Sequence, residues 1–548
     1  MPILPRVLLA AAPVALLFAA PSAAQGLPPV PSVPGNPVTN EKALLGKALF
    51  WEEQLSSTRT VACGTCHVPS AGGSDPRALE ASSANPGHDG VFGTFDDVRG
   101  SAGVVRNDAS GDYLHDALFG LRPRTTGRKS PTMINAAFSP ELFWDGRAGG
   151  AFVDPVSGSV ALAKRAALES QAAGPPVSDV EMGHDGRDWL DVLDRLANVE
   201  PLALASDVPA ELEAWIAGRG YPDLFLEAFG SSTITASRVL MAIATYERTL
   251  ISDQTPFDAM LAGDLTQLSA REIRGMIVFN GPGLCSRCHS GALTTDQSYH
   301  NIGVRPVAED VGRQAVTGLA EDRGKFKTPD LRNVALRAPY FHNGSQQNLA
   351  GVVAFYDRGG DHPENLDRLI RPLILTGNQQ ADLVAFLEGA FTDPRVANEL
   401  PPFDRPTLFS ESARRPTTFG DATPGSGGFA PEMVLFEPAL LGNPSLTIAL
   451  QRGLGGAPAL LCLDLVRAPV PFTVGGAETY LAFSPSLTVL SFGALNGAGA
   501  GAGWSSHTVV VPSDPALRGL SATLQWAVLD PGSAGGLAAT RAADLPMF

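Results

Sequence analysis

Two short stretches, Cys63-Gly-Thr-Cys-His67 and Cys285-Ser-Arg-Cys-His289, determine the fold expected for this chain, and they use four of its five cysteines. The pentad Cys-x-x-Cys-His is the attachment motif of c-type haem, in which two thiols bond to one haem and the histidine supplies an iron ligand. The sequence therefore predicts two covalently bound haem c groups. The expected attachment residues are Cys63, Cys66, His67, Cys285, Cys288 and His289.

Zinc knuckles or two disulfides are the alternative explanations of these cysteines. A structural zinc site takes four ligands, whereas each pentad offers three and the next Cys or His is far away in the sequence. A shared zinc site would also leave unexplained why a histidine follows the second cysteine both times. The haem interpretation accounts for all ten residues.

The amino-terminal end has the pattern of an export signal. Arg6 precedes an apolar run from Val7 to Ala20, and Ser22-Ala-Ala24 is a small-residue cleavage site. The run is shorter than the roughly 20 residues of a membrane span. We expect a signal peptide over residues 1–24 and a periplasmic or secreted protein; an uncleaved anchor is the alternative.

Length and charge limit the possible functions. The chain has 548 residues, which is too long for one hydrophobic core, so several domains are expected. Its net charge of −16 argues against binding to nucleic acid or to an anionic membrane surface. The acidic balance permits a basic redox partner.

The fifth cysteine, Cys462, stands in an apolar run and is expected to be buried and inert.

Helical periodicity dominates residues 40–400, and a helix precedes each pentad. Residues 25–39 form a Pro-rich amino-terminal segment, and residues 71–128, rich in Gly, Asp, Arg and Ser, are expected to form a long surface excursion. The predicted helices are Glu41–Phe50, Asp188–Ala197, Ala210–Phe229, Thr235–Ile251, Ala270–Phe279 and Gln379–Ala390.

The composition changes after about residue 400. Residues 401–430 are rich in Pro, Thr, Ser and Gly and are expected to be a linker. Beyond them, short alternating runs separated by turns, including a loop at Asn496–Gly503, predict an antiparallel β-sandwich over residues 431–548. We expect this module to serve attachment or interaction. The predicted strands are Ser445–Leu450, Thr479–Phe483, Leu487–Phe492, Thr508–Val511 and Ala522–Leu529.

Several stretches around the pentads resemble the bacterial di-haem cytochrome c peroxidases, including the related di-haem enzymes that mature tryptophan tryptophylquinone. The resemblance covers roughly residues 40–395 and does not reach residues 401–548. It implies a mainly α fold with two cytochrome-c-like domains, an N-terminal peroxidatic one over 40–250 and a C-terminal electron-relay one over 251–400. The matching stretches include Leu45-Gly-Lys-Ala-Leu-Phe50, Phe143-Trp-Asp-Gly-Arg-Ala148, Val180-Glu-Met-Gly183, Leu331-Arg-Asn333 and Ala338-Pro-Tyr-Phe-His-Asn-Gly344.

The resemblance also implies roles for individual residues. Glu181 matches the base above the peroxide-reacting haem, and Gln171 and Pro175 match positions that line the same pocket. Trp144 matches the tryptophan between the two haems. The residues by themselves leave simpler roles open: Glu181 as a cap or ion-pair partner at a helix start, and Trp144 as a core aromatic.

Three positions depart from the peroxidase pattern. The relay haem of the peroxidases takes a Met as second axial ligand, but the matching position, fourteen residues after His342, is Tyr356, as in the quinone-maturing relatives. An Asn ligand of the inter-haem calcium is replaced by Lys129, while its two carbonyl ligands match Arg337 and Pro339. We expect the ammonium to take the place of calcium and donate to those carbonyls; a bound calcium is the alternative.

The third departure concerns the loop histidine that caps the peroxide haem in many peroxidases. Its position by offset is Leu121, and the nearest candidate is His115 in the excursion. We therefore expect a peroxide haem that reacts without prior reduction.

The leading functional hypothesis is an exported di-haem peroxidase that reduces hydrogen peroxide to water, with electrons from a small cytochrome or cupredoxin entering through the His289 haem. The second hypothesis, favoured by Tyr356, is a quinone-maturing-type enzyme that uses peroxide to oxidise a protein or organic substrate. The third is a non-catalytic electron-transfer cytochrome. The sequence does not determine the donor, the final substrate or the oligomeric state.

Overall fold

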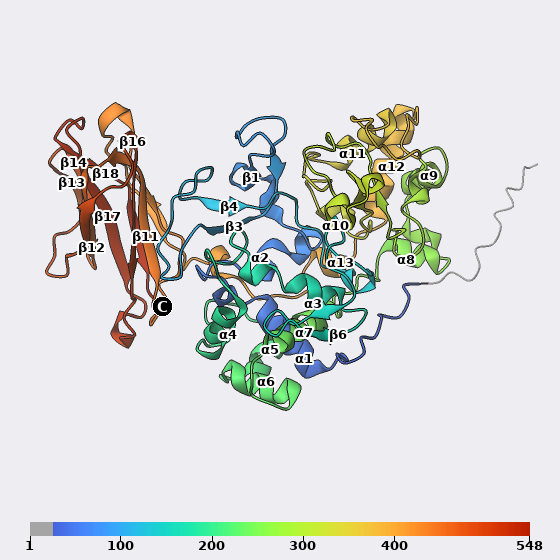
Figure 1. Ribbon diagram of the computed structural model, residues 1–548, viewed down its shortest axis with the longest axis horizontal. Helices are drawn as coiled ribbons and strands as arrows, with labels where there is room; N and C mark the ends of the chain where they lie inside the picture. Colours follow the sequence, from blue (N-terminus) through green and yellow to red (C-terminus); the bar gives the residue numbers. More distant parts are fainter. Residues whose placement is uncertain (1–25) are drawn as a thin grey trace, which may run out of the picture.

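The computed structural model describes residues 26–548, so the expected signal peptide and its cleavage site lie outside the described residues. Figure 1 shows a helical body and, at one end of it, a module made of β-strands. Residues 26–39 run without helix or strand to the first helix. The helices are α1 (Asn40–Phe50), α2 (Cys63–Cys66), α3 (Ala167–Ala172), α4 (Trp189–Ala197), α5 (Ala210–Ile216), α6 (Tyr221–Phe229), α7 (Ala236–Glu247), α8 (Pro256–Leu261), α9 (Ala270–Asn280), α10 (Gln314–Thr317), α11 (Leu349–Arg358), α12 (Gly377–Gly389) and α13 (Pro394–Ala397).

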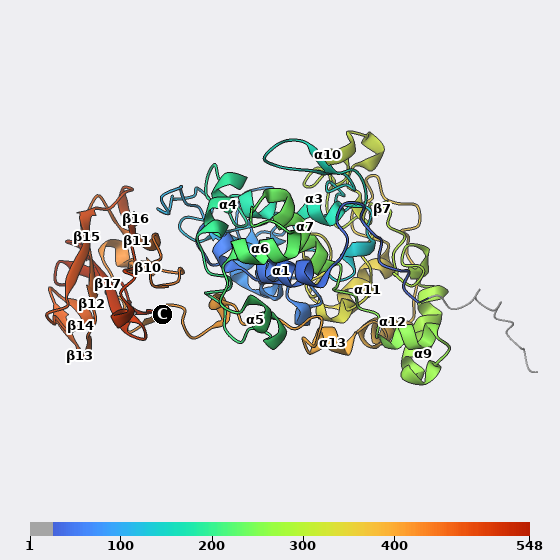
Figure 2. The same cartoon turned by 90° about the horizontal axis from the view of Figure 1, so that it is seen from below.

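The helical body contains two separate hydrophobic cores. The first is built mainly by α1, α4, α6 and α7, and the second by α9, α11 and α12. In both views α9 and α12 lie at the end of the body far from the β-module, whereas α1 and α4 to α7 lie nearer to it (Figures 1 and 2).

Each core contains a close helix–helix crossing at a glycine. A Cβ on Gly46 of α1 would lie 1.9 Å from the Ala242 carbonyl oxygen in α7, and a Cβ on Gly275 of α9 would lie 2.0 Å from the Asp382 carbonyl oxygen in α12. Only glycine fits so close an approach. Helix α1 precedes the first pentad and α9 precedes the second, so the two halves of the body repeat the same local design.

The helices predicted from periodicity are confirmed, with one difference. The predicted helix over Ala210–Phe229 is two helices, α5 and α6. Ala217 adopts a left-handed backbone conformation at φ 47°, and Gly218 and Gly220 follow, so the chain turns between the two helices.

The C-terminal module is an antiparallel sandwich. One sheet has the order β10-β11-β16 and faces a larger sheet of order β15-β12-β17-β19-β9, with β18 paired to β17; β13 and β14 form a hairpin. Apolar side chains of both sheets share one core that includes Ile448 in β11 and Trp526 in β17. The strands are β9 (Thr417–Phe419), β10 (Glu432–Val434), β11 (Leu446–Gly455), β12 (Pro458–Asp464), β13 (Arg467–Val474), β14 (Ala477–Leu481), β15 (Thr488–Ala494), β16 (Gly499–Val509), β17 (Ser521–Leu529), β18 (Leu537–Ala539) and β19 (Ala542–Pro546).

Two expectations about this module need correction. The predicted loop Asn496–Gly503 is a loop only as far as Ala498, because β16 begins at Gly499. The region expected to be a linker contains β9, which pairs with β19 at the edge of the larger sheet.

Cys462 is buried in β12, as expected, and burial raises the pKa of its thiol to about 11.

The excursion is less exposed than its composition predicts. Its short strands pair into ribbons, and Tyr113 and Leu121 are buried in a cluster with Val434 and Ala449 of the module. Part of the excursion is therefore an interface to the module rather than free surface. The remaining short strands are β1 (Ala84–Asn85), β2 (Val98–Arg99), β3 (Ala102–Val105), β4 (Pro123–Thr125), β5 (Phe152–Val153), β6 (Val160–Leu162), β7 (Tyr299–His300) and β8 (Phe326–Lys327).

Candidate active site

The two pentads have the same local geometry. The first forms the one-turn helix α2 and the second a 3-10 turn over Cys285–Arg287. In each, the histidine ring uses Nδ1 to contact a main-chain carbonyl: His67 contacts Gly73 at 3.1 Å and His289 contacts Thr294 at 3.0 Å. Such a contact fixes the ring and leaves Nε2 for a metal.

The pentad cysteines are unpaired over the residues that the structure describes, so no disulfide joins them. Burial raises the pKa of the Cys66 and Cys285 thiols to about 12 in each case. Cys63 packs against the first core and Cys285 against the second, so the two pentads do not combine into one four-ligand zinc site. The geometry thus fits the haem interpretation better than either alternative.

A cavity of about 720 Å³ opens beside the first pentad. This volume lies within the roughly 300–1,000 Å³ of ligand and cofactor sites. Its wall contains Cys63, Cys66 and His67, and it also contains the four predicted catalytic positions, Trp144, Gln171, Pro175 and Glu181. The fold therefore brings residues more than one hundred positions apart in sequence to one cavity that has the attachment groups of a haem in its wall.

Glu181 stands in a turn after the 3-10 turn Pro175–Val177, and its main-chain N–H donates to the Ser178 hydroxyl at 3.3 Å. Burial raises the pKa of its carboxyl group, although Ser178 and Arg147 oppose the shift. Glu181 lines the same cavity as Cys63 and Cys66. A carboxyl group with a raised pKa at this place can accept and return a proton.

Trp144 lies where the two halves of the helical body meet. Its indole N–H donates to the Lys129 carbonyl at 2.8 Å, and its own carbonyl accepts from the Lys327 N–H at 2.8 Å. The cavity wall around it combines residues of the first half with Lys327 and Tyr340 of the second. Trp144 is therefore bonded to main-chain atoms of both halves.

Tyr356, in α11, lies beside the second pentad. Burial raises the pKa of its phenol, and the charges of Cys285 and Cys288 add to the shift. Within residues 26–548 its hydroxyl has no hydrogen-bond partner, while Phe341 and Phe355 pack against its ring. An unpartnered hydroxyl between a pentad and an aromatic wall fits an iron ligand.

Lys129, Arg337 and Pro339 all line the cavity, but the contacts of Lys129 differ from the expectation. Its ammonium group donates to the Ser74 hydroxyl and, at 3.5 Å, to the Ser130 carbonyl. In the described part of the chain it makes no hydrogen bond to the Arg337 or Pro339 carbonyl. Burial and the repulsion from Arg337 lower the pKa of Lys129 to about 7.

His115, the candidate for a capping histidine, faces away from the cavity. Its ring packs on Trp504 of the module, with 5.6 Å between ring centroids, and it is not part of the cavity wall. Leu121 is also buried against the module. Neither residue lies where it could cap an iron in the cavity.

Glu247 is a cavity residue that the sequence reasoning missed. It ends α7 and lines the same cavity, and burial raises the pKa of its carboxyl group to about 8. One of its carboxylate oxygens has no hydrogen-bond partner within the described residues. An acidic residue at the end of an otherwise apolar helical stretch, Val239–Tyr246, was the available signal.

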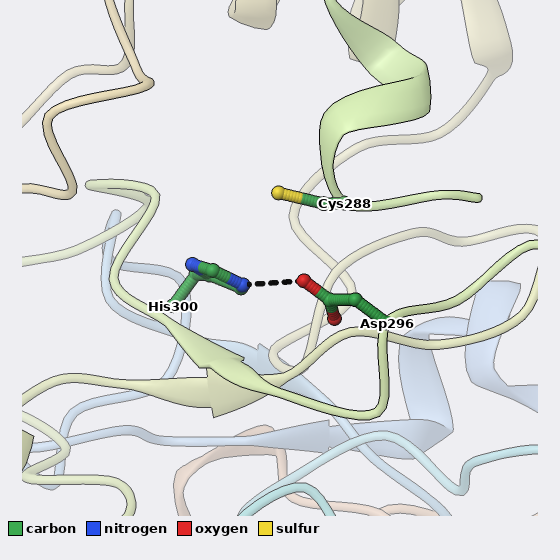
Figure 3. Close-up of side chains that lie close together, drawn as sticks. All are labelled: Cys288, Asp296 and His300. Atoms are coloured by element: carbon green, nitrogen blue, oxygen red, sulfur yellow. Dashed lines mark hydrogen bonds and ion pairs between the residues drawn. The ribbon is translucent and has the colours of Figure 1, made fainter.

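A second cluster stands next to the second pentad (Figure 3). Ligand-type atoms of Cys288, Asp296 and His300 lie within 4.8 Å of one another. His300 also contacts Asp367 at 2.7 Å, and Cys288 together with the two carboxylates raises the pKa of His300 to about 10. Since Cys288 belongs to the pentad, we interpret the cluster as a charged histidine held by two carboxylates rather than as a metal site.

A search for membrane-spanning segments gives a negative result: within residues 26–548 no helix has the length and apolarity to cross a bilayer.

Comparison with known proteins places the chain in one family. Residues 40–266 match the family model described as di-haem cytochrome c peroxidase. The chain is 33% identical over 369 residues to the methylamine utilization protein MauG of Methylorubrum extorquens, covering 67% of this chain and 82% of that protein. It is 29% identical over 419 residues to the cytochrome-c peroxidase IdrP1 of a Pseudomonas species, covering 69% and 90%.

Among solved structures, a MauG-like protein associated with microbial copper homeostasis aligns with a TM-score of 0.49 at 24% identity, covering 70% of this chain and 97% of that one. The sequence matches carry the assignment, since the relative at 33% identity is covered over most of its length. This chain belongs to the di-haem cytochrome c peroxidase family.

Proposed function

We propose that this protein is an exported di-haem c-type peroxidase that reduces hydrogen peroxide to water with electrons relayed from an external donor. The observation that carries the proposal is the position of Glu181, a carboxyl group with a raised pKa, in one cavity with Cys63, Cys66 and His67. Two relatives' names, cytochrome-c peroxidase and MauG, agree with this chemistry.

The residues present fit two haem groups. Cys63 and Cys66 would hold the first by thioether bonds with His67 as iron ligand, and Cys285, Cys288 and His289 would hold the second, with Tyr356 as a further iron ligand. Bound haem supplies the one-electron chemistry and the activation of peroxide. The repeated helix–pentad design supports two cytochrome-c-like domains over 40–250 and 251–400, followed by the segment 401–430, whose strand β9 pairs with the module, and by the module 431–548.

Glu181 provides the proton transfer that peroxide cleavage requires. Hydrogen peroxide, two electrons and two protons give two water molecules. The Glu181 carboxylate takes a proton from one oxygen of hydrogen peroxide and gives it to the other oxygen. The second oxygen therefore leaves as water and not as hydroxide. Gln171 and Pro175 line the same wall and limit the space in which peroxide can lie.

Trp144 is suited to pass electrons between the halves. Its indole lies in the cavity wall, and its main chain is hydrogen-bonded to the second half through Lys327. In this proposal electrons from a small redox protein, a cytochrome or a cupredoxin, enter at the His289 side and reach the peroxide site through Trp144. The acidic net charge favours a basic donor.

Tyr356 favours a second candidate, a quinone-maturing-type enzyme that uses peroxide to oxidise a protein or organic substrate. Methionine–histidine ligation raises a haem potential, whereas a phenolate stabilises the ferric state. A Tyr-ligated second haem would accept electrons poorly from a high-potential donor and would share oxidising equivalents more readily. A non-catalytic electron-transfer cytochrome is disfavoured because Glu181 stands in an open cavity beside the first pentad.

Stopped-flow mixing of the diferric protein with hydrogen peroxide separates these functions. Rapid turnover with a reduced cytochrome or cupredoxin would support the peroxidase. A long-lived oxidised form with near-infrared absorption would support the quinone-maturing type. If peroxide produced neither result, the electron-transfer cytochrome would remain. Export is tested separately, by the amino-terminal sequence and haem content of protein from the periplasm and the medium.

A further inference from the structure

Two carboxylates hold the His300 ring beside the second pentad. Its Nδ1 lies 2.7 Å from Asp367 Oδ2, and its Nε2 lies 3.0 Å from Asp296 Oδ2. A carboxylate only accepts hydrogen bonds, and a neutral imidazole has a single N–H to donate. Because both ring nitrogens face a carboxylate oxygen, the geometry calls for the doubly protonated ring, which carries a positive charge.

These three side chains are largely shielded from solvent. The exposed fraction is 17% for the His300 side chain and 22% for each of Asp296 and Asp367. Burial acts to raise the pKa of both carboxyl groups, but hydrogen bonds, including those from His300, outweigh it, so both pKa values are lowered. The cluster therefore holds one positive and two negative charges, which solvent screens less than charges on an open surface.

The cluster lies against a sulfur that would carry the second haem. The Cys288 Sγ and ligand-type atoms of His300 and Asp296 lie within 4.8 Å of one another, and Figure 3 shows the three side chains close together. A cysteine sulfur in a thioether bond carries no charge. His300 and Asp296 thus place their charges next to the point at which the haem would be attached.

The turn that leads from the pentad to His300 also depends on this cluster. His289 Nδ1 contacts the Thr294 carbonyl at 3.0 Å, and Asp296 follows shortly after Thr294. Thr294 and Gln297 adopt left-handed backbone conformations, at φ 51° and 58°. Residues other than glycine stay in this region only where surrounding contacts hold them. The contact between Asp296 and His300 is one that holds this turn.

On its other side the His300 ring contacts the segment that follows α11, the helix that carries Tyr356. Asp367 lies in this segment, and its main-chain N–H donates to the Asn301 carbonyl at 2.9 Å. The His300 cluster is therefore built from the two parts of the chain that would surround the second haem, the turn after the pentad and the segment beyond the proposed tyrosine ligand.

A fixed charge near a haem changes the reduction potential of that haem. Reduction adds an electron, so a nearby cation favours the reduced state and a nearby anion favours the oxidised state. Without His300, two largely buried carboxylates would lie at this site without compensation. They would add to the effect of a Tyr356 phenolate, which also stabilises the ferric state.

We propose that the His300 side chain sets the reduction potential of the second haem by placing a positive charge between the Asp296 and Asp367 carboxylates, beside the attachment sulfur. His300 thereby offsets part of the effect of Tyr356 and keeps this haem reducible by an external donor. The inference deepens the proposed function, and it rests on the attachment of a haem at the second pentad.

The test is a spectroelectrochemical titration of the full-length, haem-loaded protein at about pH 6, where a histidine beside one remaining carboxylate stays protonated. His300→Gln removes a positive charge and should lower the potential of the second haem. Asp296→Asn and Asp367→Asn each remove a negative charge and should raise it. The potential of the first haem should stay unchanged. A merely structural role of the cluster would not give shifts of opposite sign.

His362→Gln is the matched control and should leave both potentials unchanged. His362 lies in the same segment as Asp367, and within the described residues it is held through its main-chain N–H, which donates to the Gly303 carbonyl at 3.1 Å. Asp296→Asn keeps the shape of the side chain and covers the case in which His300→Gln does not fold.

Shifts of the same sign in the histidine and aspartate variants, or potentials equal to those of the wild type, would overturn the inference. The titration needs no peroxide. An inactive wild-type protein would therefore contradict the proposed peroxidase while the shifts expected here stay the same, so the two failures are distinguishable.

Discussion

The indole N–H of Trp144 donates to the main-chain carbonyl of Lys129 at 2.8 Å. This bond ties the tryptophan at the junction of the two halves to Lys129, which is buried. The Lys327 N–H holds the Trp144 carbonyl from the other side. The bond to Lys129 fixes the indole directly, whereas the bond from Lys327 of the second half holds the main chain of Trp144.

Trp144→Phe should uncouple the two haem sites. We expect peroxide-driven oxidation at the second site to slow about tenfold or more, equivalent to about 1.4 kcal/mol of barrier, while the reaction at the first site is unchanged. Stopped-flow absorbance at the two Soret bands measures both rates. Trp189→Phe is the control, since Trp189 also donates to a main-chain carbonyl, that of Ala173 at 3.1 Å, but lies outside the cavity wall. Equal effects of the two changes would contradict a bridging role.

Glu181→Gln should slow peroxide reduction by about 10²-fold or more, the usual contribution of a general acid–base group. Burial raises the pKa of Glu181, so the wild-type rate should fall as the pH drops through that raised pKa and protonates the base. The variant should lose this acidic limb. Glu247→Gln, a change in the same cavity, is the control and should keep the limb. Steady-state rates across pH check the prediction, and an unchanged Glu181→Gln would remove this residue from the mechanism.

Tyr356→Met should raise the reduction potential of the second haem, because methionine–histidine ligation favours the reduced state more than phenolate ligation does. Spectroelectrochemical titration measures the potential, and the ferric spectrum should change at the same haem only. Tyr340→Phe is a suitable control, since the Tyr340 hydroxyl donates to the Val334 carbonyl at 3.1 Å. A potential and spectrum equal to those of the wild type would show that Tyr356 is not a ligand.

Lys129→Met should change the pH dependence of stability. Folding lowers the pKa of Lys129 from 10.5 to about 7, so between these values the unfolded chain binds more protons than the folded one. The cost of burying the charge is therefore fully present below pH 7 and is relieved as the pH rises. At pH 6 the variant should be more stable by roughly 2 kcal/mol or more, with the advantage shrinking above pH 7. Denaturant unfolding at several pH values tests this, and a constant difference would refute it.

Metal content gives an independent test of the same position. We expect the wild-type protein to keep its spectra and activity after calcium chelation, because an ammonium group cannot ligate calcium and Lys129 is buried in the cavity wall. Lys129→Asn should bind calcium and become sensitive to chelation. Elemental analysis and titration of the ferric spectrum with calcium measure both. One tightly held calcium ion in the wild type would contradict this expectation.

Much of the helical half follows from the sequence. Predicted helices such as Glu41–Phe50 and Ala270–Phe279 agree with α1 and α9 within a residue or so, because amphipathic periodicity and capping residues such as Ser269 act locally. The break between α5 and α6 was missed because the apolar periodicity continues across Ala217. In the module, β12 was not predicted, because its half-buried positions Leu460 and Leu463 are as apolar as its buried ones and the sequence therefore lacks the period of two.

By itself, the sequence determined the two pentads, the helix before each, the family and the residues expected to act, because haem attachment and helix formation depend on neighbours along the chain. Only the tertiary structure decided which residues share one cavity with Cys63 and His67: Glu181, Gln171, Pro175, Trp144 and also Glu247. It likewise decided that the Lys129 ammonium group contacts Ser74. These arrangements join residues far apart in sequence, and their energies come from burial and charge in the folded state, which no local pattern encodes.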